Sequence, residues 1–243
     1  MTNFYNKMID MAYPPRCPIC DKILERYEGR IHEKCRKQLD CIEGAVCMHC
    51  GRPVLSDLVE YCFDCEKKKK SGDKDTFFQG KSLLLYKGAV KKTMYRFKYS
   101  NKREYGGFFA ELAMEQWGEW LFHCDVDVIV PVPMFRRKQK LRGYNQAEVF
   151  GRALAKQLGV PMERNIVIRK KDTRPMKELN DIERENNLRN AFQIARNIVK
   201  YKKILLVDDI YTTGSTADEV SRVLLEAGVE KIYFLSICMG QGL

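Results

Sequence analysis

Long apolar runs are missing from this chain of 243 residues. No stretch approaches the roughly 18 consecutive apolar residues that a membrane-spanning helix needs, so no membrane span is expected. The first 13 residues alternate polar and apolar side chains and contain no apolar core of a secretory signal peptide. We therefore expect a cytoplasmic protein.

Acidic residues are in short supply. The chain has 32 Asp and Glu against 43 Lys and Arg, which gives a net charge of +11. This balance favours a polyanionic partner such as nucleic acid, or a phosphorylated substrate, although a merely basic protein explains the charge equally well. A hydrophobic content of 45% supports a packed core, and the length fits one large domain or two smaller ones.

Most of the ten cysteines lie near the start of the chain. Without an export signal, metal ligation is expected rather than disulfides. Ligand pairs separated by two residues recur with a period of 15 residues, and this spacing lets both side chains of a pair reach one ion. The four pairs supply eight ligands, enough for two tetrahedral Zn²⁺ sites: Cys17 with Cys20, His32 with Cys35, Cys47 with Cys50, and Cys62 with Cys65.

The pairing of these ligands has alternatives. Sequential pairing is simplest, with the first two pairs on one ion and the last two on the other, but cross-braced pairing fits the spacing too. Cys41 is a rival to His32, and loss of the first site is also open. Because every pair is complete and suggests no open coordination position, we expect a structural role.

A lysine-rich run over residues 67–74, which contains Gly72, ends the cysteine segment. Its composition is typical of a linker. We therefore predict a double zinc ribbon over residues 1–75 and a second domain over residues 76–243.

The most informative stretch of the second domain covers residues 204–217. Residues 204–207 form an unbroken apolar run, typical of a buried parallel strand. Asp208 and Asp209 follow, and then a turn of small hydroxyl residues leads into a helical pattern. Such a loop and helix start can bind an anion through backbone N–H groups, while the carboxylates can accept hydrogen bonds from vicinal hydroxyls, as on a ribose. The predicted phosphate contacts are Thr212, Thr213, Gly214, Ser215 and Thr216.

A second strand, over residues 126–133, ends in prolines and is followed by a cation-rich loop. In a parallel α/β sheet this loop emerges at the same edge as the acid pair, where ligands bind. Arg142 can then oppose a pyrophosphate, with Asn145 or Gln146 donating near the next helix start. Strands alternating with helices from residue 82 onward predict a doubly wound α/β domain, with residues 165–169 and 191–194 as further strands and residues 170–190 as a flap.

The helix predicted from residue 88 interleaves aromatic and basic side chains. A solvated polar face explains most of this pattern, but a surface for single-stranded nucleic acid is a second interpretation. The candidate nucleic-acid contacts are Lys98, Arg136, Arg137, Lys138 and Lys140.

The stretch from Val207 to Thr216 resembles the phosphoribosyl-pyrophosphate (PRPP) motif of type I phosphoribosyltransferases. Together with the zinc-ribbon segment, Pro133 and the run from Arg142 to Gln146, it resembles the ComF family, the competence-associated phosphoribosyltransferase-like proteins of bacterial DNA uptake. Two departures stand out, since His32 and Met176 replace the usual Cys and Gln.

The resemblance implies a cytoplasmic protein that handles incoming single-stranded DNA, binds PRPP with Mg²⁺ and works with a helicase-type partner. Pro133 would join the PRPP contacts. If the protein is an enzyme, Asp208, Asp209 and Arg142 would be its catalytic residues, with Arg142 and Mg²⁺ stabilising the leaving pyrophosphate. The alternative is a phosphoribosyltransferase of nucleotide metabolism, for which no residue identifies the acceptor.

Overall fold

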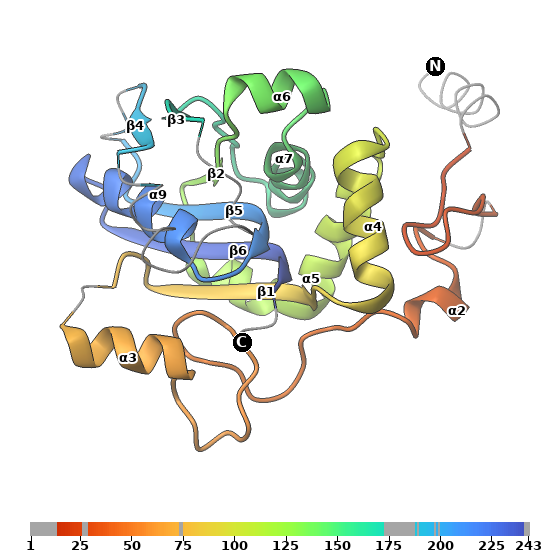
Figure 1. Cartoon of the computed structure of the whole chain (residues 1–243), viewed down its shortest axis with the longest axis horizontal. Helices are drawn as coiled ribbons and strands as arrows, with labels where there is room; N and C mark the ends of the chain where they lie inside the picture. Colours follow the sequence, from red (N-terminus) through yellow and green to blue (C-terminus); the bar gives the residue numbers. More distant parts are fainter. Residues whose placement is uncertain are drawn as a thin grey trace.

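The computed structural model describes residues 14–25, 29–72, 75–172, 188, 190–196, 198 and 200–240. Its centre is a four-stranded parallel sheet in the order β1-β6-β5-β2 (Figure 1). The strands are β1 (Gln79–Leu85), β2 (Val128–Pro131), β5 (Lys203–Tyr211) and β6 (Lys231–Met239). Because helices cover both faces, β2, β6 and the first half of β5 are buried without alternation.

The two faces of the sheet bury separate cores. On one face Leu205 and Val207 join a cluster with Phe109 and Phe150, from α5 (Tyr105–Cys124) and α7 (Gln146–Leu158). This cluster extends to α4 (Gly88–Tyr99). On the other face the core contains residues of α9 (Ser215–Glu226). The expected doubly wound α/β fold is confirmed.

Two expectations about the connections are wrong. β3 (Val167–Arg169) and β4 (Phe192–Ile194) form a separate antiparallel pair instead of joining the parallel sheet. A reason lies at the edge strand β2, where Ile129 already forms a parallel bridge with Met162. The cation-rich loop after β2 is instead a helix, α6 (Arg136–Arg142). Of the predicted flap, residues 173–187 and 189 lie outside the described residues.

The cysteine-rich segment packs against both faces of this domain (Figure 1). Cys17 and Cys35 belong to the core cluster of α4, α5 and α7, whereas Cys47 and Cys65 belong to the cluster of α9. Two short helices, α2 (Glu33–Arg36) and α3 (Phe63–Ser71), each begin directly after the first ligand of a pair, with His32 and Cys62 as their N-caps. Helix α3 continues through the lysine run as far as Ser71, so residues 67–71 are helical and do not form the expected linker. Among the described helices, none combines the length and apolar character of a membrane span.

Candidate ligand site and metal centres

The acid pair lies at the C-terminal end of β5, near the centre of the sheet. The Lys98 ammonium, from α4, lies 3.0 Å from the Asp209 carboxylate, and their side chains are only 18% and 16% exposed. Lys98, a predicted nucleic-acid contact, is thus placed inside the candidate site as the counter-charge of Asp209. A nucleic-acid role for Lys98 stays a prediction.

The electrostatics of the site favour the protonated form of Asp208. Burial, together with the adjacent charge of Asp209, raises the pKa of Asp208 to about 8, against the effect of the Asp209 backbone N–H, which donates to Asp208 Oδ1 at 2.7 Å. Burial alone would lower the pKa of Lys98, but the charge and hydrogen bond of Asp209 outweigh it and raise that pKa. The pair therefore offers both a proton donor and acceptor oxygens to vicinal hydroxyls.

The hydroxyl loop turns sharply between β5 and α9. Gly214 has φ of +86°, and a Cβ there would lie 2.5 Å from the Tyr211 hydroxyl, so both conformation and space require glycine. The Thr213 and Ser215 hydroxyls lie 2.9 Å apart. Because α9 begins at Ser215, its unpaired N–H groups and its dipole favour an anion at this loop.

The residues predicted around the pyrophosphate form a joint between α6, α7 and α4. Arg142 donates to the Gln146 side-chain carbonyl at 3.0 Å and to the Tyr99 hydroxyl at 3.3 Å. Gln146 is fully buried and donates to the Phe97 carbonyl. Asn145 caps α7 and donates to the Val132 carbonyl at 2.9 Å. Both amides thus bind the protein itself, and a direct ligand contact for them stays a prediction.

Pro133 is half-buried and lines a hollow of about 310 Å³ that also contacts Arg169. Burial lowers the pKa of Arg169, against the charge of nearby Asp208. Among the α6 cations, Arg137 and Lys138 both form ion pairs with Asp172. Arg136 and Lys140 are exposed and line a hollow of about 360 Å³.

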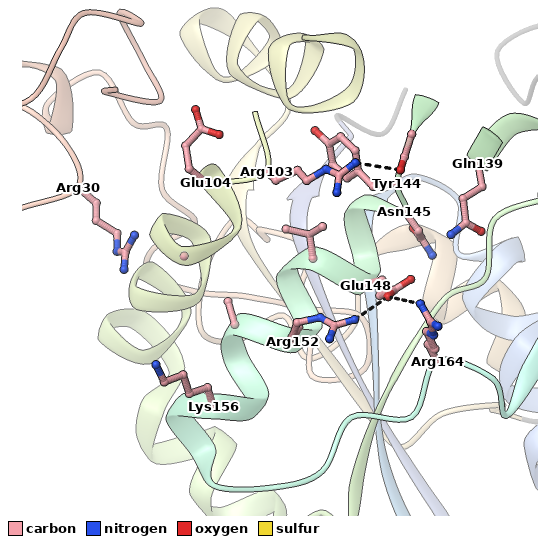
Figure 2. Close-up of a pocket in the computed structure, with 14 residues that line it drawn as sticks. Arg30, Arg103, Glu104, Gln139, Tyr144, Asn145, Glu148, Arg152, Lys156 and Arg164 are labelled. Carbon is pink, nitrogen blue, oxygen red and sulfur yellow. Dashed lines mark hydrogen bonds and ion pairs between the residues drawn. The ribbon is translucent and has the colours of Figure 1, made fainter. Parts of the chain in front are cut away.

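A larger hollow, of about 700 Å³, lies beside α5 and α7 (Figure 2). It is rich in cations, but Glu148 binds two of them, Arg152 at 2.8 Å and Arg164 at 3.2 Å. This hollow was not predicted from the sequence. Its only sequence signal is the spacing of Glu148 and Arg152 on one helix face.

The two predicted metal centres are assembled in the sequential pairing, each with its ligand atoms within 4.8 Å of one another. They are Cys17, Cys20, His32 and Cys35, and Cys47, Cys50, Cys62 and Cys65. His32 Nδ1 faces the Cys20 sulfur at 3.3 Å, while Nε2 lies 3.2 Å from the Ile23 carbonyl. Such an outer hydrogen bond orients a metal-ligating histidine. The backbone of Cys41 instead forms an antiparallel β-bridge with Leu84 of β1, and Cys41 belongs to neither centre.

The chemistry of both donor sets fits zinc. Burial raises the pKa of Cys17, but hydrogen bonds from the backbone of Cys20, His32 and Ile19 bring it down to about 7. In the second centre, hydrogen bonds from Cys50, Cys62 and Cys65 lower the pKa of Cys47. Thiolates in a closed four-ligand set are typical of structural zinc.

The second centre is joined to the hydroxyl loop. Arg52, two residues after Cys50, donates to the Thr212 carbonyl at 2.8 Å and to the Gly240 carbonyl at 3.2 Å. On the following helix, Lys68 forms an ion pair at 2.5 Å with Asp218 in the first turn of α9. Arg52 could not be predicted, because no local sequence pattern marks an arginine that donates hydrogen bonds to a segment far along the chain.

Two family models match the chain: "Double zinc ribbon domain" over residues 8–66, and "Phosphoribosyl transferase domain" over residues 145–241. The chain is 32% identical to competence protein F of Haemophilus influenzae, over 96% of each chain. The chain belongs to the ComF family. Another member, competence protein ComFC of Bacillus subtilis, is 27% identical over 87% of this chain and 89% of its own. This chain is also similar to DNA utilization protein YhgH of Salmonella typhi, with 33% identity over 46% of this chain and 49% of YhgH.

Membership of the ComF family fits the arrangement described above. A phosphoribosyltransferase-like parallel sheet follows a cysteine-rich segment with two metal centres. The boundary between the domains at residues 75 and 76 stays a prediction.

Proposed function

We propose that this protein binds PRPP at the end of β5 and handles single-stranded DNA during DNA uptake, in the cytoplasm. The observation that supports it most is the succession of Asp208 and Asp209, the loop around Gly214 and the start of α9 at one sheet edge. In this proposal the acid pair holds the ribose hydroxyls and the loop holds the 5′-phosphate. The loop contacts are Thr212, Thr213, Gly214, Ser215 and Thr216.

Magnesium would enter with the pyrophosphate. It prefers hard oxygen ligands and keeps several waters, so one or two carboxylates and the phosphates suffice. The Asp209 carboxylate is of this class, as is Asp208 in its deprotonated form, and the Lys98 ammonium beside Asp209 limits how many oxygens face a cation. Pro133, Arg142, Asn145 and Gln146 would complete the pyrophosphate side of the site.

Calorimetric titration of the zinc-loaded protein with PRPP, with and without Mg²⁺, tests this proposal. We expect one binding site per chain and tighter binding when Mg²⁺ is present. A protein that takes up no PRPP under either condition would refute the proposal.

The names of the relatives, competence protein F and DNA utilization protein, support the DNA role, as does the net charge of +11. Arg136, Arg137, Lys138 and Lys140 of α6 would contact the strand, and a helicase-type competence protein would be its partner. Phosphate contacts release counterions. Single-strand affinity should therefore fall steeply as salt rises, and binding that is insensitive to salt would contradict this role.

A second candidate function is phosphoribosyl transfer to an unidentified acceptor. The position of Arg142, beside Tyr99 and Gln146, favours it because a fixed guanidinium can stabilise a leaving pyrophosphate. Pyrophosphate released in step with the consumption of an acceptor would establish turnover. PRPP binding without any release would support a binding protein that PRPP controls.

A further inference from the structure

Helix α4 exposes two aromatic rings on one face. Tyr95 and Tyr99 are 63% and 60% exposed, although they are one helical turn apart on a helix whose opposite face is buried. Their ring centroids lie 5.0 Å apart. The α4 side chains that enter the core are Val90, Thr93, Met94 and Phe97, so these tyrosines are not needed to anchor the helix.

Cations surround the two rings. Lys91 and Lys92 are exposed on the preceding turn of α4, and together with Tyr86 and Tyr95 they line a hollow of about 430 Å³. At the other end the Arg142 guanidinium lies over the Tyr99 ring, 5.0 Å from its centroid. Single-stranded nucleic acid binds to surfaces of this kind, because its bases stack on exposed aromatic rings and its phosphates contact the cations beside them.

The helix is also held rigidly. The Thr93 hydroxyl donates to the Pro18 carbonyl at 2.6 Å, and Arg96 donates to the carbonyls of Pro18 and Ile19. These acceptors lie between the first ligand pair, Cys17 and Cys20, so the first metal centre braces α4 from behind. A preset platform loses less conformational entropy on binding than a mobile one.

We infer that Tyr95 and Tyr99 form a base-stacking platform for single-stranded nucleic acid, with Lys91 and Lys92 contacting its phosphates. The inference rests on the proposed function, because the platform leads to the candidate PRPP site. Lys98, which directly precedes Tyr99 on α4, faces inward to Asp209, whereas Tyr99 contacts Arg142 outside the candidate site. A strand lying on α4 would therefore end beside the bound phosphoribosyl group.

The test compares ring removal with ring retention in the zinc-loaded, full-length protein. Fluorescence anisotropy with a labelled oligothymidylate of about 12 nucleotides, a length within the range of one binding domain, gives the affinity. Tyr95→Ala and Tyr99→Ala should each weaken binding by roughly 5- to 150-fold, the range measured for one lost base stack. Tyr95→Phe keeps the ring and should bind within about twofold of the wild type.

Controls separate stacking from charge and from damage to the fold. Phe122→Ala removes an aromatic side chain that is 61% exposed on α5, and it should leave the affinity unchanged. Lys91→Ala with Lys92→Ala should reduce the salt dependence by about one unit of slope per cation. The loss in Tyr95→Ala should appear with the single strand and not with a duplex of the same length, because paired bases are not available to stack.

The outcomes distinguish this inference from the function on which it rests. If the wild type binds the single strand and the Tyr95→Ala/Tyr99→Ala protein binds within about twofold of it, the platform is refuted while the DNA role stands. If the wild type does not bind the strand at all, both fail, and PRPP titration of the same preparation shows whether the other half of the proposed function survives.

Discussion

Replacing Arg52 by Ala should weaken PRPP binding without removing zinc. The side chain joins the turn of the second metal centre to the proposed phosphate loop by a hydrogen bond to the Thr212 carbonyl, and it donates a second bond to the Gly240 carbonyl after β6. Hydrogen bonds to a charged group contribute about 1.5–3 kcal/mol each. Because Thr212 is exposed, water recovers part of the lost energy, and we expect a net loss of about 2 kcal/mol.

If the whole of that loss falls on the loop, the dissociation constant for Mg²⁺–PRPP rises by up to about 30-fold, since 1.4 kcal/mol corresponds to a factor of ten. Calorimetry measures the affinity and metal analysis measures the zinc. The matched control is Arg36→Ala, which removes an exposed ion pair with Glu115 near the first centre. Exposed ion pairs contribute at most about 1 kcal/mol to stability. The ion pair between Arg36 and Glu115 does not involve the phosphate loop, so PRPP affinity should not change.

The reasoning is refuted if Arg52→Ala holds both zinc ions and binds PRPP as tightly as the wild type. It is also refuted if Arg36→Ala weakens PRPP binding to the same extent, because the effect would then be a general loss of stability.

Three further outcomes follow from the contacts described. The folded-state pKa of Asp208 lies near 8, above its unfolded value, so the free energy of unfolding should fall as pH rises from about 4 to 8, by at most about 1.4 kcal/mol per pH unit. In urea unfolding, the free energy of Asp208→Asn should depend less steeply on pH than that of the wild type, and equal pH slopes would contradict the prediction. Lys98→Met should destabilise the fold by roughly 2–4 kcal/mol, because Asp209 is left without its counter-charge. Adding Asp209→Asn should restore much of that stability in the same unfolding assay, and no recovery would argue against a stabilising ion pair between Lys98 and Asp209. Metal analysis should find one zinc ion instead of two in Cys35→Ser and two in Cys41→Ser. A loss of zinc from Cys41→Ser would place Cys41 among the ligands, contrary to the structure.

The parts of the site that could be predicted are those written locally in the sequence. The apolar run, Asp208, Asp209 and the turn at Gly214 follow one another, so strand, carboxylates and loop needed no knowledge of distant contacts. The ligand pairs were predictable for a similar reason, because a two-residue gap and a constant period specify them, whereas their sequential combination was left open and comes from the structure. The choice of His32 over Cys41 needed the structure.

The parts that could not be predicted depend on contacts between distant segments. Lys98 has the pattern of a solvated cation, and only the packing of α4 against the sheet places it on Asp209. Helix α6 has no buried residues, and its single large apolar side chain, Leu141, is 83% exposed, so no hydrophobic periodicity marks it. β3 and β4 are three residues each, too short for alternation to specify a register.

The central claim is that the end of β5 is a PRPP site, and one calorimetric comparison tests it most directly. Mg²⁺–PRPP is titrated into the wild type and into the Asp208→Asn/Asp209→Asn protein, both loaded with zinc. The two substitutions keep the size of the side chains but replace one oxygen of each with an NH2 group, which removes the negative charge and part of the acceptors that would hold the ribose hydroxyls. We predict one site in the wild type and a loss of affinity of at least about tenfold in the variant, since hydrogen bonds to a charged group contribute about 1.5–3 kcal/mol each. Unchanged PRPP binding in the variant would contradict the account.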